Sequence, residues 1–393
     1  MEKETVNPGR LTAVVRSKAF ELGFEVVAVA PVGPSPDFDL FMRWIEDGHA
    51  AEMSYLPGRA AERADPRHLL PEARSIVVLG ANYFSGNLPS ELRNDRSRGL
   101  IASYAWSADY HDTLKRRLFD LDTALREASG RTDMGRACVD TSPILERSWA
   151  SRAGLGFGGK NTCLIVPGAG SWFFLAELLV PEKLAYGSWT ASEPVPVSHS
   201  HEGTCGQCTR CLNICPTGAF PEPFILDSRR CISYLTIENR EAIPLELRPL
   251  LANWVFGCDL CQTICPWNRR YATRRQLPRT GELAEVAAPK LLDLLALDEK
   301  GFRQRFRKSP IKRAKRRGLL RNVCVALGNW ADPAAIPGLS QAMEDSESLI
   351  RSHAAWALGK IGTAHARLLL QSCLEKEHDP EVLLEITAAL AMK

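Results

Sequence analysis

Eight of the twelve cysteines fall within 61 residues, in the middle of the 393-residue chain. The first four precede a proline in the pattern C-x2-C-x2-C-x3-C-P, and they are Cys205, Cys208, Cys211 and Cys215. In such a run three closely spaced thiolates bind three corners of a four-iron cluster, and the fourth thiolate binds a second cluster. The spacing therefore predicts two [4Fe-4S] clusters, each a carrier of one electron.

A second run, C-x2-C-x3-C-P, ends at Pro266 and has Val255 where the first run has its opening cysteine. Cys231 is the one other cysteine nearby, so we assign it to the vacant position. One bacterial ferredoxin-like cluster then has the ligands Cys205, Cys208, Cys211 and Cys265, and the other has Cys215, Cys231, Cys258 and Cys261. Zinc is the alternative, since eight thiolates can also form two tetrahedral sites. The repeated spacing and the proline after each run favour iron and sulfide.

The composition predicts a soluble protein of two or three domains, with 45% hydrophobic and 24% charged residues. No apolar stretch reaches the roughly 18 residues of a membrane span, and the first residues do not resemble a secretory signal. We therefore expect a cytoplasmic protein without a membrane segment, and a monomer. Because the cytosol is reducing, the four scattered cysteines should be buried small apolar residues: Cys138, Cys163, Cys324 and Cys373.

The elements around the cysteines predict an α+β multidomain protein. Helical spacing of apolar residues at 11–22 and 111–128, and strand-like segments at 25–30, 75–80, 162–166 and 172–179, indicate an α/β domain over residues 1–195. A Pro/Ser/His-rich linker, Glu193–His199, separates this domain from the cysteine region. The predicted domains are thus 1–195, a two-cluster domain at 196–268, a basic connector at 269–317 and a helical domain at 318–393.

The helical domain contains a weak repeat. Arg321–Gly328 is echoed 30 residues later by Arg351–Gly359, and each copy precedes a turn. Short helix pairs of the HEAT type have this appearance, and two such pairs would form a small solenoid. An ordinary helical bundle is the alternative.

Eleven Lys and Arg residues lie between Lys300 and Arg321, with no Asp or Glu among them. Because the formal net charge of the chain is only +3, this block is a local basic patch. Dense cationic side chains can neutralise the phosphates of RNA. The alternative is a solvated face without a partner. The glycine-rich segment Gly154–Lys160 lacks the spacing of a P-loop, and from the residues alone it is either a phosphate-binding loop or a simple turn.

The sequence as a whole resembles the epoxyqueuosine reductase family, which completes queuosine at the wobble position of tRNA. The residues that carry the resemblance extend over nearly the whole length. They are Glu52–Leu56, Arg63–Arg67, Tyr104 with Tyr110 and His111, Val139–Pro143, Gly154–Cys163, Arg230–Ile237, Trp254–Asp259, Pro310–Arg313 and Leu320–Asn322.

The resemblance implies an oxidoreductase with cobalamin in the N-terminal domain, next to one cluster, while the second cluster relays electrons from an external low-potential donor. The implied reaction removes the epoxide oxygen as water. Asp140 stands where the family has its proton donor, and its pKa would have to be raised for this role. From the sequence alone, a helix cap or turn is the alternative for this aspartate. The implied cobalamin contacts are Arg63, Asp140, Asn161, Ser233, Phe256, Gly257 and Cys258.

The resemblance also gives the basic block a partner, the anticodon stem-loop of tRNA, with Lys312, Arg313, Arg316 and Arg321 as the expected RNA contacts. One stretch departs from the family pattern: Ser103–Ala108 lacks two basic residues and a glycine that the family usually has there. Two other functions compete. A reductive dehalogenase is usually exported and has no basic helical tail, whereas a non-catalytic electron-transfer or RNA-binding protein would retain no corrin.

Overall fold

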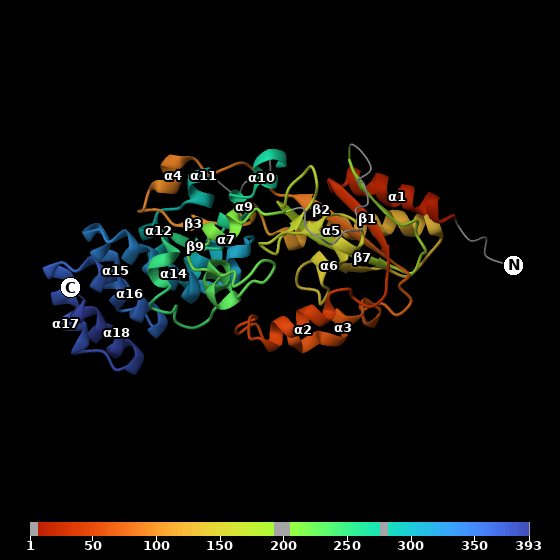
Figure 1. Cartoon of the computed structure of the whole chain (residues 1–393). Helices are drawn as coiled ribbons and strands as arrows, with labels where there is room; N and C mark the ends of the chain where they lie inside the picture. The colour runs from red at the N-terminus through yellow and green to blue at the C-terminus, as the bar shows by residue number, and fades with distance from the viewer. Residues whose placement is uncertain (1–6, 192–204, 276–281, 393) are drawn as a thin grey trace.

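The computed structural model describes residues 7–191, 205–275 and 282–392. A mostly antiparallel sheet with its helices forms one end of the molecule, the helical repeats form the other end, and the cysteine region lies between them (Figure 1). The predicted linker at 193–199 and the boundary at 195 lie outside the described residues. Among the described helices, none combines the length and the apolar character needed to cross a bilayer.

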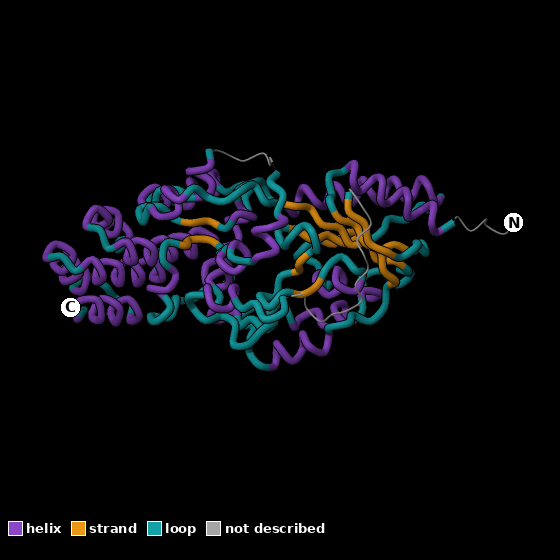
Figure 2. The backbone as a smooth tube through the Cα atoms, turned by 45° about the horizontal axis from the view of Figure 1, so that its top comes forward, coloured by secondary structure: helices purple, strands orange, loops and turns teal. Residues whose placement is uncertain are grey.

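The sheet has five strands in the order β4-β7-β2-β1-β8, and every pair of neighbours is antiparallel. The strands are orange in Figure 2, and their bounds are β1 Val26–Pro31, β2 Ser75–Asn82, β4 Arg136–Cys138, β7 Phe173–Val180 and β8 Gly187–Thr190. Strand β2 is buried along its whole length because both faces of the sheet are covered. Three predicted strands coincide with β1, β2 and β7. The fourth, at 162–166, shortens to β6 (Leu164–Ile165), which pairs with β5 (Phe157–Gly158).

Helices α1 (Pro8–Glu21) and α5 (Tyr110–Ser129) pack on one face of this sheet, and α6 (Glu146–Arg152) packs on the other. Asp109 caps α5 by accepting the backbone N–H of His111, and the helix ends at Gly130, whose φ of 74° suits a glycine. Both predicted helices of this domain are confirmed. Two short helices complete it, α2 Phe38–Glu46 and α3 Ala60–Ala64, whereas α4 Ser90–Asn94 lies beside the C-terminal half of the chain (Figure 1).

The cysteine region is built from short helices that contain or adjoin the cysteines. Their bounds are α7 Arg210–Ile214, α8 Ile232–Ile237, α9 Leu260–Thr263 and α10 Pro266–Tyr271. One strand of this region, β9 (Trp254–Phe256), pairs in parallel with β3 (Leu100–Ile101) of the N-terminal domain. This pairing places the backbone before Cys258 directly against the segment after Ile101.

Helices alone form the rest of the described chain. They are α11 Leu283–Ala287, α12 Leu291–Leu295, α13 Glu299–Arg305, α14 Lys315–Trp330, α15 Ile336–Ala342, α16 Ser348–Ile361, α17 Ala364–Leu374 and α18 Pro380–Ala391. The glycine that ends each copy of the repeat lies at a helix contact. A Cβ on Gly328 would lie 2.4 Å from the ring of Trp356, and one on Gly359 would lie 2.7 Å from Cβ of Ala389. The echoed glycines thus let α14, α16 and α18 pack closely.

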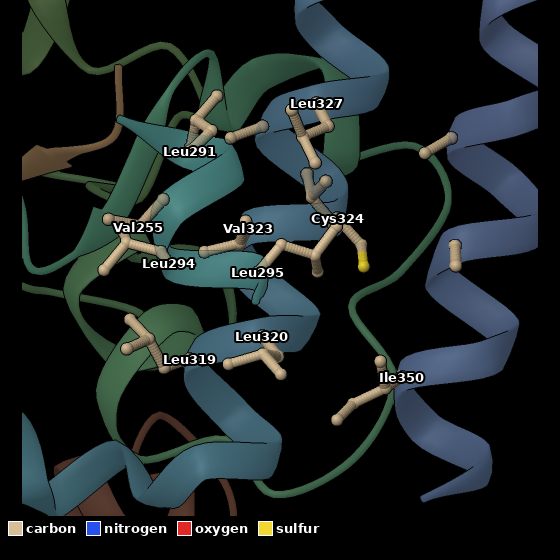
Figure 3. Close-up of a cluster of buried hydrophobic side chains, with 14 of the residues drawn as sticks. Val255, Leu291, Leu294, Leu295, Leu319, Leu320, Val323, Cys324, Leu327 and Ile350 are labelled. Carbon is tan, nitrogen blue, oxygen red and sulfur yellow. The ribbon is translucent and has the colours of Figure 1, made fainter. Parts of the chain in front are cut away.

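One hydrophobic core joins the cysteine region to the helical repeats. In Figure 3, Val255 of β9 lies among the leucines of α12 and α14, and Ile350 of α16 faces Cys324. The buried residues of this core extend from Ile101 to Ala389. The predicted boundaries at 268 and 317 therefore fall inside one packed core, and the division into domains remains a prediction.

Candidate active site and cluster region

Asp140 lies directly after β4, at the start of a tight turn. Its φ of 49° is left-handed, a conformation that costs free energy for a residue with a Cβ. The backbone N–H of Asp140 donates to Oε1 of Glu146 at 2.5 Å, and the N–H of Thr141 donates to the carbonyl of Val139. Because the turn is held in this way, 56% of the Asp140 side chain is exposed at the surface of the site.

Two residues at the N-terminus of α5 hold the carboxylate of Asp140. The hydroxyl of Tyr110 donates to Oδ2 at 2.9 Å, and Nε2 of His111 lies 3.0 Å from the same oxygen. The other ring nitrogen, Nδ1 of His111, lies 2.7 Å from Oδ1 of Asp109, whose second oxygen pairs with Nζ of Lys312 at 2.7 Å. An unbroken chain of polar contacts therefore leads from the basic block to Asp140.

The charges along this series of polar contacts lower the pKa of Asp140 and raise that of His111. Burial favours the neutral form of Asp140, but the hydrogen bonds from His111 and Tyr110 outweigh it and lower the pKa of Asp140. Burial likewise favours the neutral form of His111, but the carboxylates of Asp109 and Asp140 raise its pKa to about 9. The expectation of a raised pKa for Asp140 is thus wrong for the site in this state, where the proton of the pair resides on His111.

Aromatic rings surround the Asp140 site. The ring of Tyr110 stacks on Phe174 with centroids 4.1 Å apart, and Tyr104 lies 6.3 Å from Tyr110 and 6.0 Å from Phe256. Beside Phe256, Gly257 has a φ of 68°, and a Cβ there would lie 2.6 Å from Cβ of Ala102. The backbone of this segment is held by the Gly257 N–H, which donates to the hydroxyl of Thr236 on α8.

The structure brings several predicted cofactor residues to the border between the sheet domain and the cysteine region. Nδ2 of Asn161 donates to the carbonyl of Cys261, and its Oδ1 accepts the N–H of Cys163. Ser233 lies on α8, two residues after Cys231. These residues share that border with Phe256, Gly257 and Cys258.

Arg63 lies elsewhere, on α3, where it is 7% exposed. Its guanidinium donates to the carbonyl of Arg59 and lies over the ring of Phe41. Tyr55 links Arg63 electrostatically to the Asp140 site. The charges of Asp140 and Arg313 act on the pKa of Tyr55, and Tyr55 in turn acts on the pKa of Arg63.

The thiols of the cysteine region fall into two groups. Cys211 has Cys205 and Cys265 as electrostatic neighbours, while the backbone N–H of Cys208 donates to the carbonyl of Cys205. Cys258 has Cys231 and Cys215 as neighbours, and Cys261 has Cys258 and Cys231. Cys211 and Cys258 thus have neighbours from the first and the second predicted ligand set, respectively, but no three of the described thiols lie close enough to hold a metal ion, so both ligand sets remain predictions.

Cys163 differs from its prediction as an isolated buried residue. It is only partly buried, and the neighbouring thiol of Cys261 lowers its pKa. Sequence spacing missed this contact, since the two cysteines are almost one hundred residues apart. Cys373 is also partly buried, whereas Cys138 and Cys324 are buried as expected.

The four predicted RNA contacts occupy different environments. Arg321 is fully buried, and its guanidinium donates to the carbonyls of Leu235, Asn239 and Glu241. The assignment of Arg321 to RNA is therefore wrong, because no part of its side chain reaches the surface. Arg316 is largely buried in a pair with Asp345. Lys312 and Arg313 are about half exposed, and Arg313 forms a bidentate pair with Glu238 at 2.8 Å.

Four residues of the site are predicted from the sequence only through the resemblance, or are not predicted at all. Tyr110 and His111 were noticed only as part of the resemblance, although their place directly after the helix cap Asp109 fixes both rings on one side of α5. Glu146 and Glu177 were missed. A glutamate six residues after Asp140 and a lone glutamate within the apolar strand Phe173–Val180 were the available signals.

Comparison with known proteins gives three family matches. Residues 63–141 match the family epoxyqueuosine reductase QueG, residues 204–268 match the 4Fe-4S double cluster binding domain, and residues 312–391 match HEAT repeats. The epoxyqueuosine reductase of Pseudomonas aeruginosa is 38% identical over 91% of this chain and 96% of the relative. The chain belongs to the epoxyqueuosine reductase family. The Escherichia coli member is 36% identical, over 91% of each protein.

Solved structures of epoxyqueuosine reductases have the same fold. A crystal structure of one with an epoxyqueuosine-modified stem loop of tyrosine tRNA superposes with a TM-score of 0.86, at 32% identity, over 98% of each chain. The enzyme from Streptococcus thermophilus gives 0.83 at 25% identity, over 97% of this chain and 98% of that one. The predictions of the fold class, of a two-cluster ferredoxin-like region and of C-terminal HEAT-like repeats are confirmed. The double-cluster match decides between iron–sulfur and zinc.

Proposed function

We propose that this chain reduces epoxyqueuosine to queuosine at the wobble position of tRNA. The observation that carries the proposal is the hydrogen-bonded group of Asp140, Tyr110 and His111, which faces a two-cluster region in a member of this reductase family. Removal of the epoxide oxygen consumes two electrons and two protons, releases one water and leaves a carbon–carbon double bond. The site therefore needs an electron path and a source of protons.

The electron path consists of two [4Fe-4S] clusters. We assign Cys205, Cys208, Cys211 and Cys265 to one and Cys215, Cys231, Cys258 and Cys261 to the other. The neighbour relations of the thiols support this assignment. The second set includes Cys258, which follows Gly257 at the border with the Asp140 site. Electrons from an external low-potential donor would thus enter at the first set and leave from the second.

The residues at this border suit a large planar cofactor such as cobalamin. Tyr104 is an aromatic side chain beside Phe256, the backbone of Gly257 packs closely against Ala102, and the side chain of Asp140 is 56% exposed. The expected contacts are Asn161, Ser233 and the backbone of 256–258, with Arg63 approaching from α3. When bound, cobalamin supplies a strong reductant and nucleophile.

Asp140 is the proposed proton donor to the departing epoxide oxygen. At neutral pH the proton of the pair resides on His111, because its pKa is about 9 while that of Asp140 is lowered. A substrate that excludes water from Asp140 would favour its neutral form and draw this proton across the 3.0 Å contact. His111 therefore stores the proton, and Asp140 delivers it.

The tRNA partner would contact the basic residues next to this site. Lys312 and Arg313 are exposed enough to reach phosphates, and the positive charge of Arg313 acts on Asp140 itself. Arg316 is a weaker candidate because its side chain is only 15% exposed. A tRNA substrate also fits the cytoplasm as the place of action.

The test is anaerobic reconstitution with iron, sulfide and cobalamin, followed by mass analysis of the wobble nucleoside of epoxyqueuosine-containing tRNA. We expect queuosine with the wild type, and a rate about 10²–10⁴ lower with Asp140→Asn. Corrin absorbance and iron content serve as controls for the variant. A wild type that converts no more epoxyqueuosine than reduced donor alone would refute the proposal.

A further inference from the structure

Glu177 is a carboxyl group in the centre of the sheet. It lies on β7, opposite Val78 of β2 and Cys138 of β4, and it is 0% exposed. Neither of its carboxyl oxygens has a hydrogen-bond partner among the described residues when the group is ionised. A buried carboxylate without a partner is very unfavourable, so this group requires a proton.

Glu146 is the acidic neighbour of Glu177. It begins α6, which packs on β7, and its Oε1 accepts the backbone N–H of Asp140. Burial, followed by the charge of Asp140, raises the pKa of Glu146 to about 8. Burial and the charge of Glu146 raise the pKa of Glu177 well above the ordinary range.

The chemistry of two facing carboxyl groups decides which one carries the proton. An ionised carboxylate only accepts hydrogen bonds, whereas a protonated one can donate. Oε1 of Glu146 already accepts the N–H of Asp140, whereas neither oxygen of Glu177 has a partner among the described residues, so Glu177 is the carboxyl group that must carry a proton and donate to Glu146. Glu146 then accepts from two donors, the carboxylic acid of Glu177 beneath it and the N–H of Asp140 above it.

We propose that this chain of hydrogen bonds, from protonated Glu177 through Glu146 to the backbone N–H of Asp140, is a latch that holds Asp140 in its working position. This inference rests on the proposed function only because that function makes Asp140 the proton donor. Glu146 and Glu177 are positioning residues, since neither one reaches the substrate. The left-handed backbone of Asp140 is the strained conformation that such a latch must maintain.

The latch opens when Glu177 loses its proton. Glu177 then faces the negative charges of Glu146 and Asp140 and the thiol of Cys138, while Arg147 is the cation that acts on Glu146. On the other side, Asp140 faces Tyr110 and His111, and His111 also becomes neutral near pH 9. Ionisation of Glu146, whose pKa is about 8, leaves it an acceptor, so the loss of protons from Glu177 and His111 is what weakens the hold on the turn at 140–143.

Hydrogen exchange at the amide of Asp140 tests the latch in the cluster-loaded full-length protein, without corrin or tRNA. We expect exchange of this amide, corrected for its intrinsic pH dependence, to rise about tenfold in Glu146→Ala at pH 7, because the acceptor is lost. Glu146→Gln keeps an amide oxygen as acceptor and should retain most of the protection. Glu182→Gln, which changes a buried glutamate near the end of β7 that pairs with Arg131, is the matched control and should leave the Asp140 amide unchanged.

Glu177→Gln keeps the shape of the side chain but removes its titratable proton, so it tests the effect of that proton alone. A glutamine amide donates at every pH, so protection of the Asp140 amide should fall less in alkaline solution in this variant than in the wild type. Identical pH dependence in the two proteins, or wild-type protection in Glu146→Ala, would overturn the latch. Because the measurement uses no substrate, its outcome is independent of whether the wobble nucleoside is converted.

Discussion

Nζ of Lys312 lies 2.7 Å from Oδ2 of Asp109, and the other oxygen of Asp109 lies 2.7 Å from Nδ1 of His111. A lysine of the basic block is therefore one carboxylate away from the histidine that contacts Asp140. Contact with an RNA phosphate would draw Lys312 away from Asp109 and alter the charge that His111 experiences. In the proposed tRNA complex, binding of RNA at Lys312 would thus change the protonation of His111.

Replacement of His111 by glutamine should destabilise the protein in a pH-dependent way. The folded-state pKa of His111, about 9, is raised above the usual 6.5, so its stabilising contribution is fully present below pH 6.5 and is lost as the pH rises through 9. We expect the unfolding free energies of wild type and variant to differ by about 1–3 kcal/mol at pH 6 and to converge above pH 9.5. Urea unfolding at both pH values measures this difference. A difference that does not change with pH would contradict the assigned pKa.

The carboxylate of Asp140 contributes to the pKa of His111, so Asp140→Asn should lower it. The effect arises because the variant removes a negative charge 3.0 Å from Nε2. Titration of the His111 ring by nuclear magnetic resonance follows this pKa directly. The pKa should remain above 6.5 because Asp109 still holds Nδ1. Glu182→Gln, far from the ring, should leave the titration unchanged.

Substitution of Cys231 should remove one cluster, whereas substitution of Cys163 should remove none. Cys231 fills the position that Val255 leaves vacant in the second run, and Cys163 only contacts Cys261. We expect Cys231→Ala to retain about half of the wild-type iron and Cys163→Ala to retain nearly all of it. Iron analysis with electron paramagnetic resonance after reduction distinguishes them. Equal iron loss in both variants would make Cys163 a ligand.

Lys312 and Arg313 should contribute to tRNA affinity mainly through charge. Each substitution by alanine should weaken binding at low salt and reduce the slope of log K against log salt by about one. Arg303→Ala is the matched control, because this arginine is 75% exposed in the same basic block and pairs only with Glu299 on its own helix. Filter binding over a salt series gives the slopes. If Arg303→Ala lowers the slope as much as the other two, the RNA lies on a broader surface than proposed.

Arg321 should matter for stability and not for RNA. Its guanidinium satisfies the carbonyls of Leu235, Asn239 and Glu241, which join α8 and the loop after it to α14. Arg321→Met fills similar space but leaves these buried acceptors unpaired, so we expect a loss of at least about 3 kcal/mol of unfolding free energy. Denaturant unfolding is the measurement. A stable variant with weakened tRNA binding would reverse the assignment.

Local patterns predicted those parts of the fold and site that depend on neighbours in sequence. The apolar run Ser75–Gly80 and the cysteine spacings are of this kind, and both were found from the sequence. The burial of Arg321 could not be found in this way, because its partners Leu235–Glu241 lie some 80 residues earlier and the residue looks like part of a basic run. The lowered pKa of Asp140 could not be predicted for a similar reason, because it depends on a hydrogen bond from His111, which lies on another element.

The single core that joins Val255 of the cysteine region to Leu319 and Ile350 of the repeats has a thermodynamic consequence. Binding of iron to the thiolates stabilises the native state of everything that unfolds together with them. Helices α16 and α18, which carry none of the cluster cysteines, should therefore melt at a lower temperature when the iron is chelated. Deletion of those helices should conversely weaken the retention of iron, so that assembly of the clusters and completion of the tail proceed as one cooperative event.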